Sequence, residues 1–553
     1  MLVERELVTP AQLGEALLQQ SASGKRLGAL LVELGALGER SLAEALSEQL
    51  GLPIVDLRHE EPRADAVAAL PESLARSLGA MPLRRVDGAL DVAVADPLHP
   101  GLGDQLAAAA GTPVRLHVAP ASEVRRMIDH AYRALSGLDR HVQEFEAVAA
   151  DRAHAAAETP LQLAVDENAP IVQVVNLLVT QALRDRASDI HLEPQDDRVR
   201  VRYRIDGALH DVVSLPTDMG PALVSRIKIM AGMNIVEKRR SQDGQIETSV
   251  DGRSLDIRVA TTPVIWGEKT VLRLLDKSRS LLKMGDLGMS AETHAEFSEV
   301  VRSPFGMVIC AGPTGSGKTT TLYATLAQIN QTERNIMTIE DPVEYILPSV
   351  NQIQINEQAD VTFAGGLKAI LRQDPDIILV GEIRDVETAR IAVQSALTGH
   401  FVLSSLHATD AAAALHRFLD MGIESFLVAS SVLAVVGQRL VRRICVSCKA
   451  PYRLPPEELA FYEKLGGPPK DEFFHGEGCN FCAGTGYQDR IGVYEMMHLT
   501  DEMKQLIVGN AVHHELRELA VAQGMRPLRD EALRLVAGDV TTVSEILRSV
   551  YPL

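Results

Sequence analysis

Hydrophobic and polar positions follow several different periods along the 553-residue chain, and each period predicts a kind of element. The apolar run GMVICAG at 306–312 predicts a buried strand, and the segment KTTTLYATLAQI from Lys318 has the spacing of a helix. A second apolar run, DIILV at 376–380, predicts another buried strand. Strands followed by helices predict a fold of the α/β class, and the length predicts several domains, because one core rarely holds so many residues.

The first fifty residues contain an internal repeat. LVERELVTPAQLGEALLQQ at 2–20 matches LVELGALGERSLAEALSEQ at 31–49 in eight positions. Each copy predicts a short helix, a turn and a second helix, with the N-cap of the second helix at Thr9 or a nearby polar residue. Apolar segments from 66 to about 132 predict a small α/β unit, and the charged, alanine-rich residues 136–160 predict a partly helical linker.

The segment RVRVRYRIDG at 198–207 alternates arginines with apolar residues. Because strand side chains alternate between two faces, Arg198, Arg200, Arg202 and Arg204 share one face. Neighbouring guanidinium groups repel one another unless an anion faces them. That face is therefore either the solvated side of a half-buried strand or a site where at least one arginine meets a phosphate from another domain or subunit.

Composition narrows the class of protein. The chain is 46% hydrophobic, and its net charge of −19 argues against a protein that coats nucleic acid, because neutralising phosphates needs clustered Lys and Arg. The start, MLVERE, lacks the regions of a signal peptide. The most apolar stretch, FLVASSVLAVVG at 426–437, is about half the roughly 20 residues of a membrane-spanning helix. We therefore expect a cytoplasmic protein without a membrane span.

The stretch AGPTGSGKTT from Ala311 carries the pattern G-x-x-x-x-G-K-[ST] between the predicted strand and helix. Backbone N–H groups of such a loop bind phosphate oxygens, and the following helix N-terminus favours negative charge. Lys318 is expected to reach the outer phosphates of ATP, and the Thr319 hydroxyl is expected to ligate Mg²⁺. The candidate nucleotide-binding residues are Gly312, Pro313, Thr314, Gly315, Ser316, Gly317, Lys318, Thr319 and Thr320.

Acidic residues follow two predicted strands. Glu340 and Glu344 lie in IMTIEDPVEYI, and Glu382 follows the run DIILV. A carboxylate delivered beside a P-loop can position Mg²⁺ and the attacking water. Gly381 occupies the usual aspartate position, so these contacts fall to Glu382 and to an earlier acidic group such as Glu340.

Two histidines, His400 and His407, lie at the ends of a predicted strand in TGHFVLSSLHATDA. A core histidine is more often structural than catalytic. Their position after the P-loop and the acidic strand nevertheless favours phosphate sensing by at least one of them.

Four of the five cysteines form two pairs, Cys445-x-x-Cys448 and Cys479-x-x-Cys482. Two such pairs can supply four thiolates to a tetrahedral Zn²⁺. The residues between the pairs exceed the usual finger spacing and predict a subdomain of their own. A redox pair is the alternative that the pattern leaves open.

These motifs resemble those of the type II secretion and type IV pilus assembly ATPases. GPTGSGKTT, TIEDPVE, DPDIILVGEIRD and TGHFVLSSLHATDA are similar, in order, to the Walker A, Asp box, Walker B and His box of that family. The resemblance runs from the arginine strand to the chain end and implies a RecA-like P-loop ATPase core preceded by a PAS-like α+β domain. The family has the same tetracysteine arrangement, but it commonly has an arginine where this chain has Gln245, which leaves the contacts near that turn open.

The resemblance also implies roles for individual side chains. The implied catalytic set is Glu344 as the catalytic carboxylate, Glu382 and Glu340 as metal and water ligands, His400 and His407 as γ-phosphate sensors, and Arg202 and Arg204 as arginines that reach a neighbour's nucleotide. The segment RLGALLVELGALGERSLAEALSEQ at 26–49 resembles the cyclic-di-GMP-binding motif found on some of these ATPases. Arg26 would then contact a guanine, and Leu27, Gly28 and Leu31 would line the dinucleotide; the alternative is a helical docking module without a ligand.

Taken together, the resemblance implies a homo-hexameric ATPase that binds ATP, Mg²⁺ and Zn²⁺. It would act at the inner face of the cytoplasmic membrane on a platform protein and on the cytoplasmic domain of an assembly protein, without nucleic acid. Extension of a type IV pilus, which the N-terminal repeat favours, and type II secretion both fit. The alternatives are a nucleic-acid-dependent RecA-like translocase and a nucleotide-gated switch without net hydrolysis.

We expect six segments. They are an N-terminal regulatory or docking domain at 1–135, a linker at 136–160, the PAS-like domain at 161–280, the P-loop domain at 281–440, a tetracysteine subdomain at 441–496 and C-terminal helices at 497–553.

Overall fold

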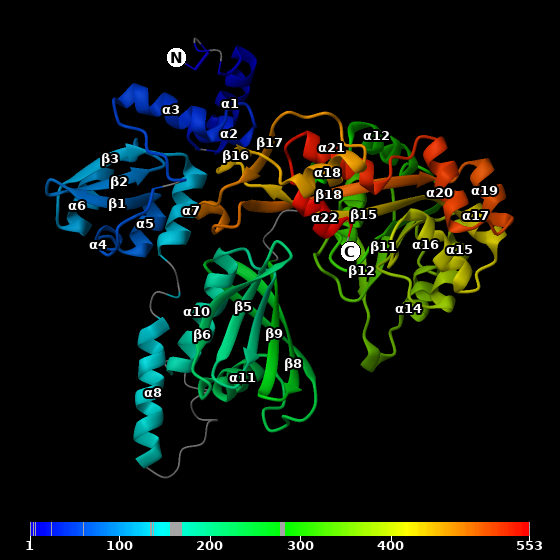
Figure 1. The fold of residues 1–553 in the computed structure, drawn as a ribbon, viewed down its shortest axis with the longest axis horizontal. Coiled ribbons are helices and arrows are strands. Elements are labelled where there is room, and N and C mark those ends of the chain that lie inside the picture. The colour runs from blue at the N-terminus through cyan, green and yellow to red at the C-terminus, as the bar shows by residue number, and fades with distance from the viewer. Residues whose placement is uncertain are drawn as a thin grey trace.

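The computed structural model of the protein describes residues 2–551 apart from 4, 6, 24, 59, 133–134, 136–137, 155–168 and 277–281. Three α/β bodies follow one another along the chain: a small N-terminal unit, a second domain and a larger P-loop domain (Figure 1). This mixed architecture confirms the α/β multidomain class expected from the sequence. No helix in the described parts of the chain combines the length and the apolar character needed to cross a bilayer.

The N-terminal unit combines helices α1 to α7 with a three-stranded sheet of order β1-β2-β3. The Thr9 hydroxyl accepts a hydrogen bond from the Gln12 N–H at 3.3 Å, which confirms the predicted N-cap. The short helix expected before Thr9 is absent from the described residues there, which form turns and bends. The elements are α1 (Pro10–Ser23), α2 (Leu27–Glu33), α3 (Glu39–Leu50), α4 (Ala64–Val67), α5 (Glu72–Leu78), β1 (Ala80–Val86), β2 (Ala89–Val94), α6 (Leu102–Ala110), β3 (Val114–Val118) and α7 (Ala121–Ala131).

Helix α8 (Leu138–His154) occupies most of the segment expected to be a linker, and residues 155–160 lie outside the described ones. Leu138 and Phe145 of this helix are buried against the second domain. That domain is a six-stranded antiparallel sheet of order β6-β5-β4-β9-β8-β7 with two helices packed on it. Its elements are α10 (Pro170–Arg184), β4 (Asp189–Pro194), β5 (Val199–Ile205), β6 (Ala208–Leu215), α11 (Met219–Met230), β7 (Gln242–Val250), β8 (Arg253–Val264) and β9 (Gly267–Asp276).

The P-loop domain is built on a seven-stranded sheet of order β12-β11-β13-β14-β10-β15-β18, parallel except for the β15–β18 pair. Strand β10 lies between β14 and β15, and all six of its residues are buried. The elements are η2 (Met284–Asp286), α12 (Ala291–Val300), β10 (Gly306–Ala311), α13 (Lys318–Ile329), β11 (Ile336–Glu340), β12 (Asn351–Gln354), η3 (Glu357–Ala359), α14 (Phe363–Ile370), β13 (Ile377–Val380), α15 (Val386–Leu397), β14 (Phe401–Leu406), α16 (Ala411–Asp420), α17 (Ser425–Ser431), β15 (Val432–Ile444) and β18 (Tyr487–His498).

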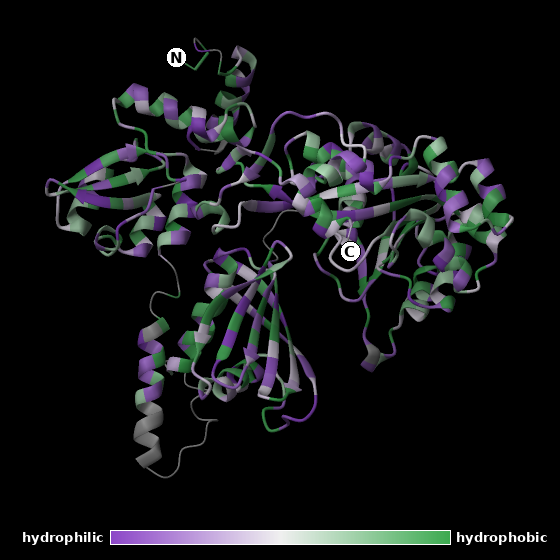
Figure 2. Cartoon of the chain, viewed as in Figure 1, coloured by the Kyte–Doolittle hydropathy of each residue, from purple (hydrophilic) through white to green (hydrophobic). Residues whose placement is uncertain are grey.

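Both faces of this sheet are covered by helices. Met307 and Ile309 of β10 belong to one hydrophobic core, and Val308 and Cys310 belong to the core on the opposite face. The strands of the second domain differ from β10, because hydrophobic and hydrophilic residues are mixed along each of them (Figure 2). Burial raises the pKa of Cys310 to about 12, so this fifth cysteine is a protonated core residue, separate from the paired ones.

The segment that contains the four paired cysteines, Cys445 to Cys482, forms a lobe that we call the cysteine lobe. It lies between the N-terminal unit and the P-loop domain (Figure 1). Its elements, with the C-terminal helices, are β16 (Lys449–Tyr452), α18 (Pro456–Lys464), β17 (Phe473–Gly476), η4 (Asn480–Cys482), α19 (Asp501–Val508), α20 (His513–Ala522), α21 (Leu528–Ala537) and α22 (Val543–Ser549). The N-terminal unit packs on η4. The Asn480 amide donates to the Glu60 carbonyl at 3.0 Å, and the Arg126 guanidinium lies 4.7 Å from the centre of the Phe481 ring.

The arginine stripe on β5 has anions supplied by its own sheet. Arg200 pairs with Asp211 of β6 at 2.5 Å, and Arg202 donates to Glu193 of β4 at 2.8 Å. Arg204 lies 3.6 Å from Asp189, also of β4. These carboxylates offset the repulsion that the alternation predicts, because neighbouring strands place acidic side chains on the same face.

Glu545 fastens α22 to β15. Its side chain is fully buried, and it accepts hydrogen bonds from the Arg442 N–H and guanidinium and from Arg548. Burial alone would raise the pKa of Glu545, but the hydrogen bonds from Arg548 and Arg442 outweigh it and hold the pKa below its usual value.

We predict that Glu545→Gln lowers the free energy of unfolding by roughly 2–4 kcal/mol at pH 7, because the largely buried guanidinium of Arg442 loses its buried counter-charge. A carboxyl with a lowered folded-state pKa stabilises the fold above its unfolded pKa of about 4.3, and this stability is lost as the pH falls through the folded-state pKa. Thermal unfolding should therefore separate the two proteins at pH 7 and bring them together in acid. Glu518→Gln, at an exposed position on α20, is the control and should match the wild type throughout.

Candidate active site

The P-loop joins the end of β10 to the start of α13. Gly317 adopts the left-handed conformation at φ +88°, which a residue with a side chain reaches only with strain. The Lys318 ammonium donates to the carbonyls of Gly312 and Pro313 at 2.9 and 3.1 Å. Burial lowers the pKa of Lys318, and the nearby carboxylate of Glu382 partly offsets that shift.

Glu382 follows β13 and faces the P-loop. Its carboxylate pairs with Arg384 and lies 3.4 Å from Nε2 of His407. Gly381 precedes it where β13 passes close to β11: a Cβ there would lie 3.2 Å from the Ile339 carbonyl oxygen. The glycine at the usual aspartate position is thus explained by close backbone packing.

The two glutamates of the Asp box have different surroundings. Glu340 is 3% exposed and ends strand β11, with its carboxylate held by side chains of its own domain. Glu344 lies further along the turn, and 30% of its side chain is exposed. Glu344 is therefore the one with a carboxylate open toward the cavity.

The two histidines lie at opposite ends of β14. His407 follows the carboxyl end of the strand, at the edge where the P-loop and Glu382 lie. His400 precedes the amino end, where its Nδ1 lies 3.0 Å from the Ser395 carbonyl oxygen. At about 3.3 Å per residue, the two histidines are about 20 Å apart, so His400 does not join the cluster at the P-loop.

A large cavity of about 2360 Å³ lies between the N-terminal unit, the second domain, the P-loop domain and the cysteine lobe. Residues 314–320 of the P-loop line it, as do Glu340, Glu344, Glu382 and His407. Its volume exceeds the roughly 300–1,000 Å³ of an ordinary ligand pocket, which marks it as an open cleft between domains.

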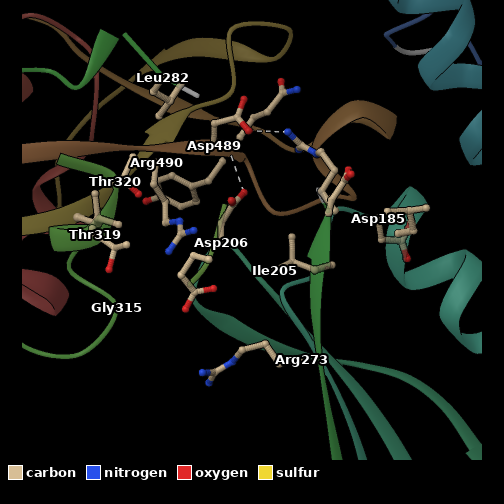
Figure 3. A pocket seen from close by; sticks show the side chains of 18 of the residues that line it. Asp185, Ile205, Asp206, Arg273, Leu282, Gly315, Thr319, Thr320, Asp489 and Arg490 are labelled. Atoms are coloured by element: carbon tan, nitrogen blue, oxygen red, sulfur yellow. Dashed lines mark hydrogen bonds and ion pairs between the residues drawn. The ribbon is translucent and has the colours of Figure 1, made fainter. Parts of the chain in front are cut away.

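Sequence reasoning missed the arginines that line this cavity from the second domain. They are Arg184, Arg186, Arg253, Arg258 and Arg273, whereas Arg202 and Arg204 do not line it. Arg258 lies on β8 and Arg273 on β9. Arg258 Nη2 lies 3.6 Å from Glu344 Oε2, across the cleft. Arg273, 59% exposed, extends into the space between the domains (Figure 3). No spacing in the sequence singles out these two among the many arginines of the second domain.

Gln245, where the resembling family commonly has an arginine, lies directly opposite Arg258 in the β7–β8 ladder. Its amide donates to both carboxylate oxygens of Asp256 at 2.8 and 2.9 Å. The position thus adjoins the arginine that faces Glu344.

A polar junction between the second domain and β18 lines the cavity. Arg186 of the second domain pairs with Asp489 at 2.7 Å, and the Asp489 N–H donates to Asp206 at 3.2 Å (Figure 3). Asp489 lies on β18 next to the cysteine lobe. The second domain therefore touches the P-loop domain both at Glu344 and at this strand.

The four paired cysteines come together as a compact, buried cluster. Their sulfur atoms all lie within 4.8 Å of one another, and three of the distances are 3.8–3.9 Å. Four sulfurs around a tetrahedral Zn²⁺ at about 2.3 Å lie roughly 3.8 Å apart. Backbone N–H groups of Gly478, Cys479 and Gly486 also point at these sulfurs. The cluster could therefore hold a zinc ion.

The candidate dinucleotide residues lie far from this cleft along the chain, at the start of α2. Arg26 is exposed and pairs with Asp96 at 2.7 Å, and it also donates to the Leu98 carbonyl. Leu27 and Gly28 are half-buried, whereas Leu31 is fully buried in the small helical core. Arg26 and the segment around Asp96 thus form one surface, and Leu31 is buried in the helical core beneath it.

Comparisons with known proteins agree with this arrangement. A family model described as "Type II/IV secretion system protein" matches residues 164–548, and one described as "MshEN domain" matches residues 50–138. The solved structure of the ATPase DotB of Legionella pneumophila is 20% identical, with a TM-score of 0.51 over 67% of this chain and 93% of that one. This last likeness concerns the fold alone.

Curated relatives match almost the whole length. The chain is 39% identical over 567 residues to the type IV pilus assembly ATPase PilB of Myxococcus xanthus (strain DK1622), covering 100% of this chain and 98% of the relative. It is 39% identical over 557 residues to the type II secretion system protein E of Xanthomonas campestris pv. campestris, covering 99% and 97%. With one family model over most of its length and relatives matched end to end, the protein belongs to the type II/IV secretion system ATPases.

Proposed function

We propose that this protein is a cytoplasmic, hexameric motor ATPase that drives assembly of a type IV pilus or of a type II secretion pseudopilus. The observation that carries the proposal is the contact between Arg258 and Glu344 across the cleft. It joins the second domain to the carboxylate we assign to catalysis, so that a change at the nucleotide can move one domain relative to the other. Such a motion is what a mechanical ATPase requires.

We assign several residues of the cleft a role in ATP hydrolysis. Lys318 would leave the carbonyls of its own loop and bind the outer phosphates, while the N–H groups of the loop hold the remaining oxygens. Glu344 would accept the proton of the attacking water, and His407 beside Glu382 would face the γ-phosphate. Thr319 and Glu382 would hold Mg²⁺, which supplies charge neutralisation at the phosphates.

Arg258 and Arg273 are the arginines we propose for the phosphate, in place of Arg202 and Arg204. Arg202 and Arg204 pair with Glu193 and Asp189 of their own sheet, and neither lines the cavity, whereas Arg258 and Arg273 both line it. Arg273 donates from Nε to Asp189 at 3.1 Å, but its side chain is 59% exposed and lines the cleft, so we propose that the outer N–H groups of its guanidinium bind the phosphate.

The partners follow from the relatives. The pilus relative and the secretion relative match the full chain with the same identity, so the N-terminal repeat does not separate the two outcomes. In either case the ring would act at the inner face of the cytoplasmic membrane, on a platform protein and on the cytoplasmic domain of an assembly protein.

We predict that Lys318→Ala lowers ATP turnover by at least about 100-fold, because the outer phosphates lose their main positive contact. Introduced into the source organism, it should abolish either surface filaments, seen by electron microscopy, or secretion of folded proteins, seen in the culture medium. Lys464→Ala, an exposed lysine of α18, is the control and should preserve both. Normal turnover in Lys318→Ala would contradict the proposal.

Two competing functions have simple tests in the same preparation. A nucleic-acid translocase should be stimulated more than about tenfold by single-stranded DNA, which the net charge of −19 does not favour. A nucleotide-gated switch should keep its turnover when Glu344 is replaced by Gln.

We further propose that the four cysteines hold one structural zinc ion. Metal analysis of the purified full chain should give about one Zn per chain, and Cys482→Ser should lose both the metal and the fold of the cysteine lobe, because structural zinc contributes roughly 10 kcal/mol to folding. Hydrogen exchange confined to 441–496 and the adjoining N-terminal unit would locate the loss. A full-length protein with four reduced cysteines and no metal would refute the site.

Cyclic-di-GMP is the ligand we propose for the surface around Arg26. Calorimetric titration of the full chain should show saturable binding, and Arg26→Ala should weaken it by at least about tenfold, because a guanidinium contact to a base is lost. The control is Arg40→Ala, an exposed arginine of α3. Wild-type protein that releases no heat would identify the repeat as a docking module instead.

A further inference from the structure

One buried hydroxyl joins the P-loop helix to the Asp box. Tyr323 lies in α13, five residues after Lys318, and only 1% of it is exposed. Its hydroxyl donates to a carboxylate oxygen of Glu340 and accepts a hydrogen bond from the Glu344 backbone N–H at 3.2 Å. A helix rises about 1.5 Å per residue, so this link lies about 7.5 Å along the helix from the phosphate-binding lysine.

The direction of both hydrogen bonds is fixed by chemistry. The Glu340 carboxylate can only accept, and its other oxygen already takes bonds from the Thr338 hydroxyl at 2.6 Å and the Gln352 amide at 3.2 Å. The Tyr323 proton therefore points at Glu340. Burial, with the Glu340 charge, raises the pKa of Tyr323, so the hydroxyl keeps its proton. Its lone pair is left for the Glu344 N–H.

The same network holds the turn on both sides of Glu344. Gln352 also donates to the Tyr345 carbonyl at 3.1 Å and accepts from the Leu347 N–H at 2.7 Å. The Tyr345 ring stands edge-on to the Tyr323 ring, with centres 6.2 Å apart. The Glu344 side chain thus stays open to the cavity, while the backbone that carries it is fastened to α13 and β12.

We propose that Tyr323 is a positioning residue for hydrolysis. Its hydroxyl, with Glu340 as a buried anchor, sets the place of the Glu344 backbone relative to the P-loop helix, so that phosphate binding and the catalytic carboxylate share one rigid frame. This inference rests on the catalytic role proposed above for Glu344. It assigns Glu340 a structural part, because three donors already occupy its two oxygens.

The test is Tyr323→Phe in the full-length ATPase, which removes the hydroxyl and keeps the ring in place. Misplacement of a catalytic group by about 1 Å can cost on the order of 100-fold in rate. We expect kcat to fall by at least about tenfold while KM for ATP changes less than about twofold. The control is Tyr203→Phe, a fully buried tyrosine whose hydroxyl donates to the Leu178 carbonyl in the second domain.

The two variants should lose similar thermal stability, because each loses one buried hydroxyl, and only Tyr323→Phe should lose kcat. A kcat in Tyr323→Phe equal to that in Tyr203→Phe would overturn the proposal, since the hydroxyl would then serve stability alone.

A double variant shows whether Tyr323 acts through Glu344. In single-turnover measurements, adding Tyr323→Phe to Glu344→Gln should change the residual rate by less than about twofold, because the group being positioned is already gone. Losses that multiply instead would mean that Tyr323 acts elsewhere, and would overturn the inference. If Glu344→Gln keeps full turnover, the catalytic role of Glu344 and the positioning role of Tyr323 both fail. If Glu344→Gln loses turnover but Tyr323→Phe matches its control, the catalytic role of Glu344 stands and only the positioning role of Tyr323 is refuted.

Discussion

Burial of strand β10 between two parallel neighbours is the constraint on which the rest of this molecule depends. All six of its residues are buried, and alternate residues serve the cores on the two faces of the sheet. Because β10 is held on both sides, its carboxyl end has a fixed place at one edge of the sheet. The P-loop starts at that edge. Because β11, β13 and β14 run parallel to it, they deliver Glu340, Glu382 and His407 to the same edge.

Buried carboxylates with backbone or side-chain donors recur throughout this acidic chain. Glu495 accepts from the N–H groups of Ala411 and Leu528 at 2.8 and 3.1 Å, at the starts of two helices, and burial raises its pKa. Glu545 ties α22 to β15, and Glu340 anchors the Asp box. In each case hydrogen-bond donors surround the buried carboxylate and stabilise its charge. Each carboxylate also joins helices and strands that are separate in the sequence.

The arginines of the second domain differ in whether they line the cleft. On β5 the arginines meet acidic side chains of β4 and β6, which occupy them. On β8, by contrast, Arg258 reaches out of its own sheet to Glu344. The arginines of β5 are therefore neutralised within the second domain, whereas Arg258 of β8 faces the cleft, where a nucleotide would add negative charge.

The sequence alone determined those parts of the protein that depend on residues close together in the chain. The phosphate loop depends on glycines and a lysine at fixed spacing, the cysteine pairs on their short repeats, and the buried strands on continuous apolar runs, and all of these are visible without coordinates. Only tertiary structure separated His400 from His407, since the two ends of one strand look alike in sequence. Only the tertiary structure showed that Arg202 and Arg204 pair within their own sheet while Arg258 pairs with Glu344 of the other domain. The partner of a charge depends on which strands and domains become neighbours, and the fold as a whole decides that.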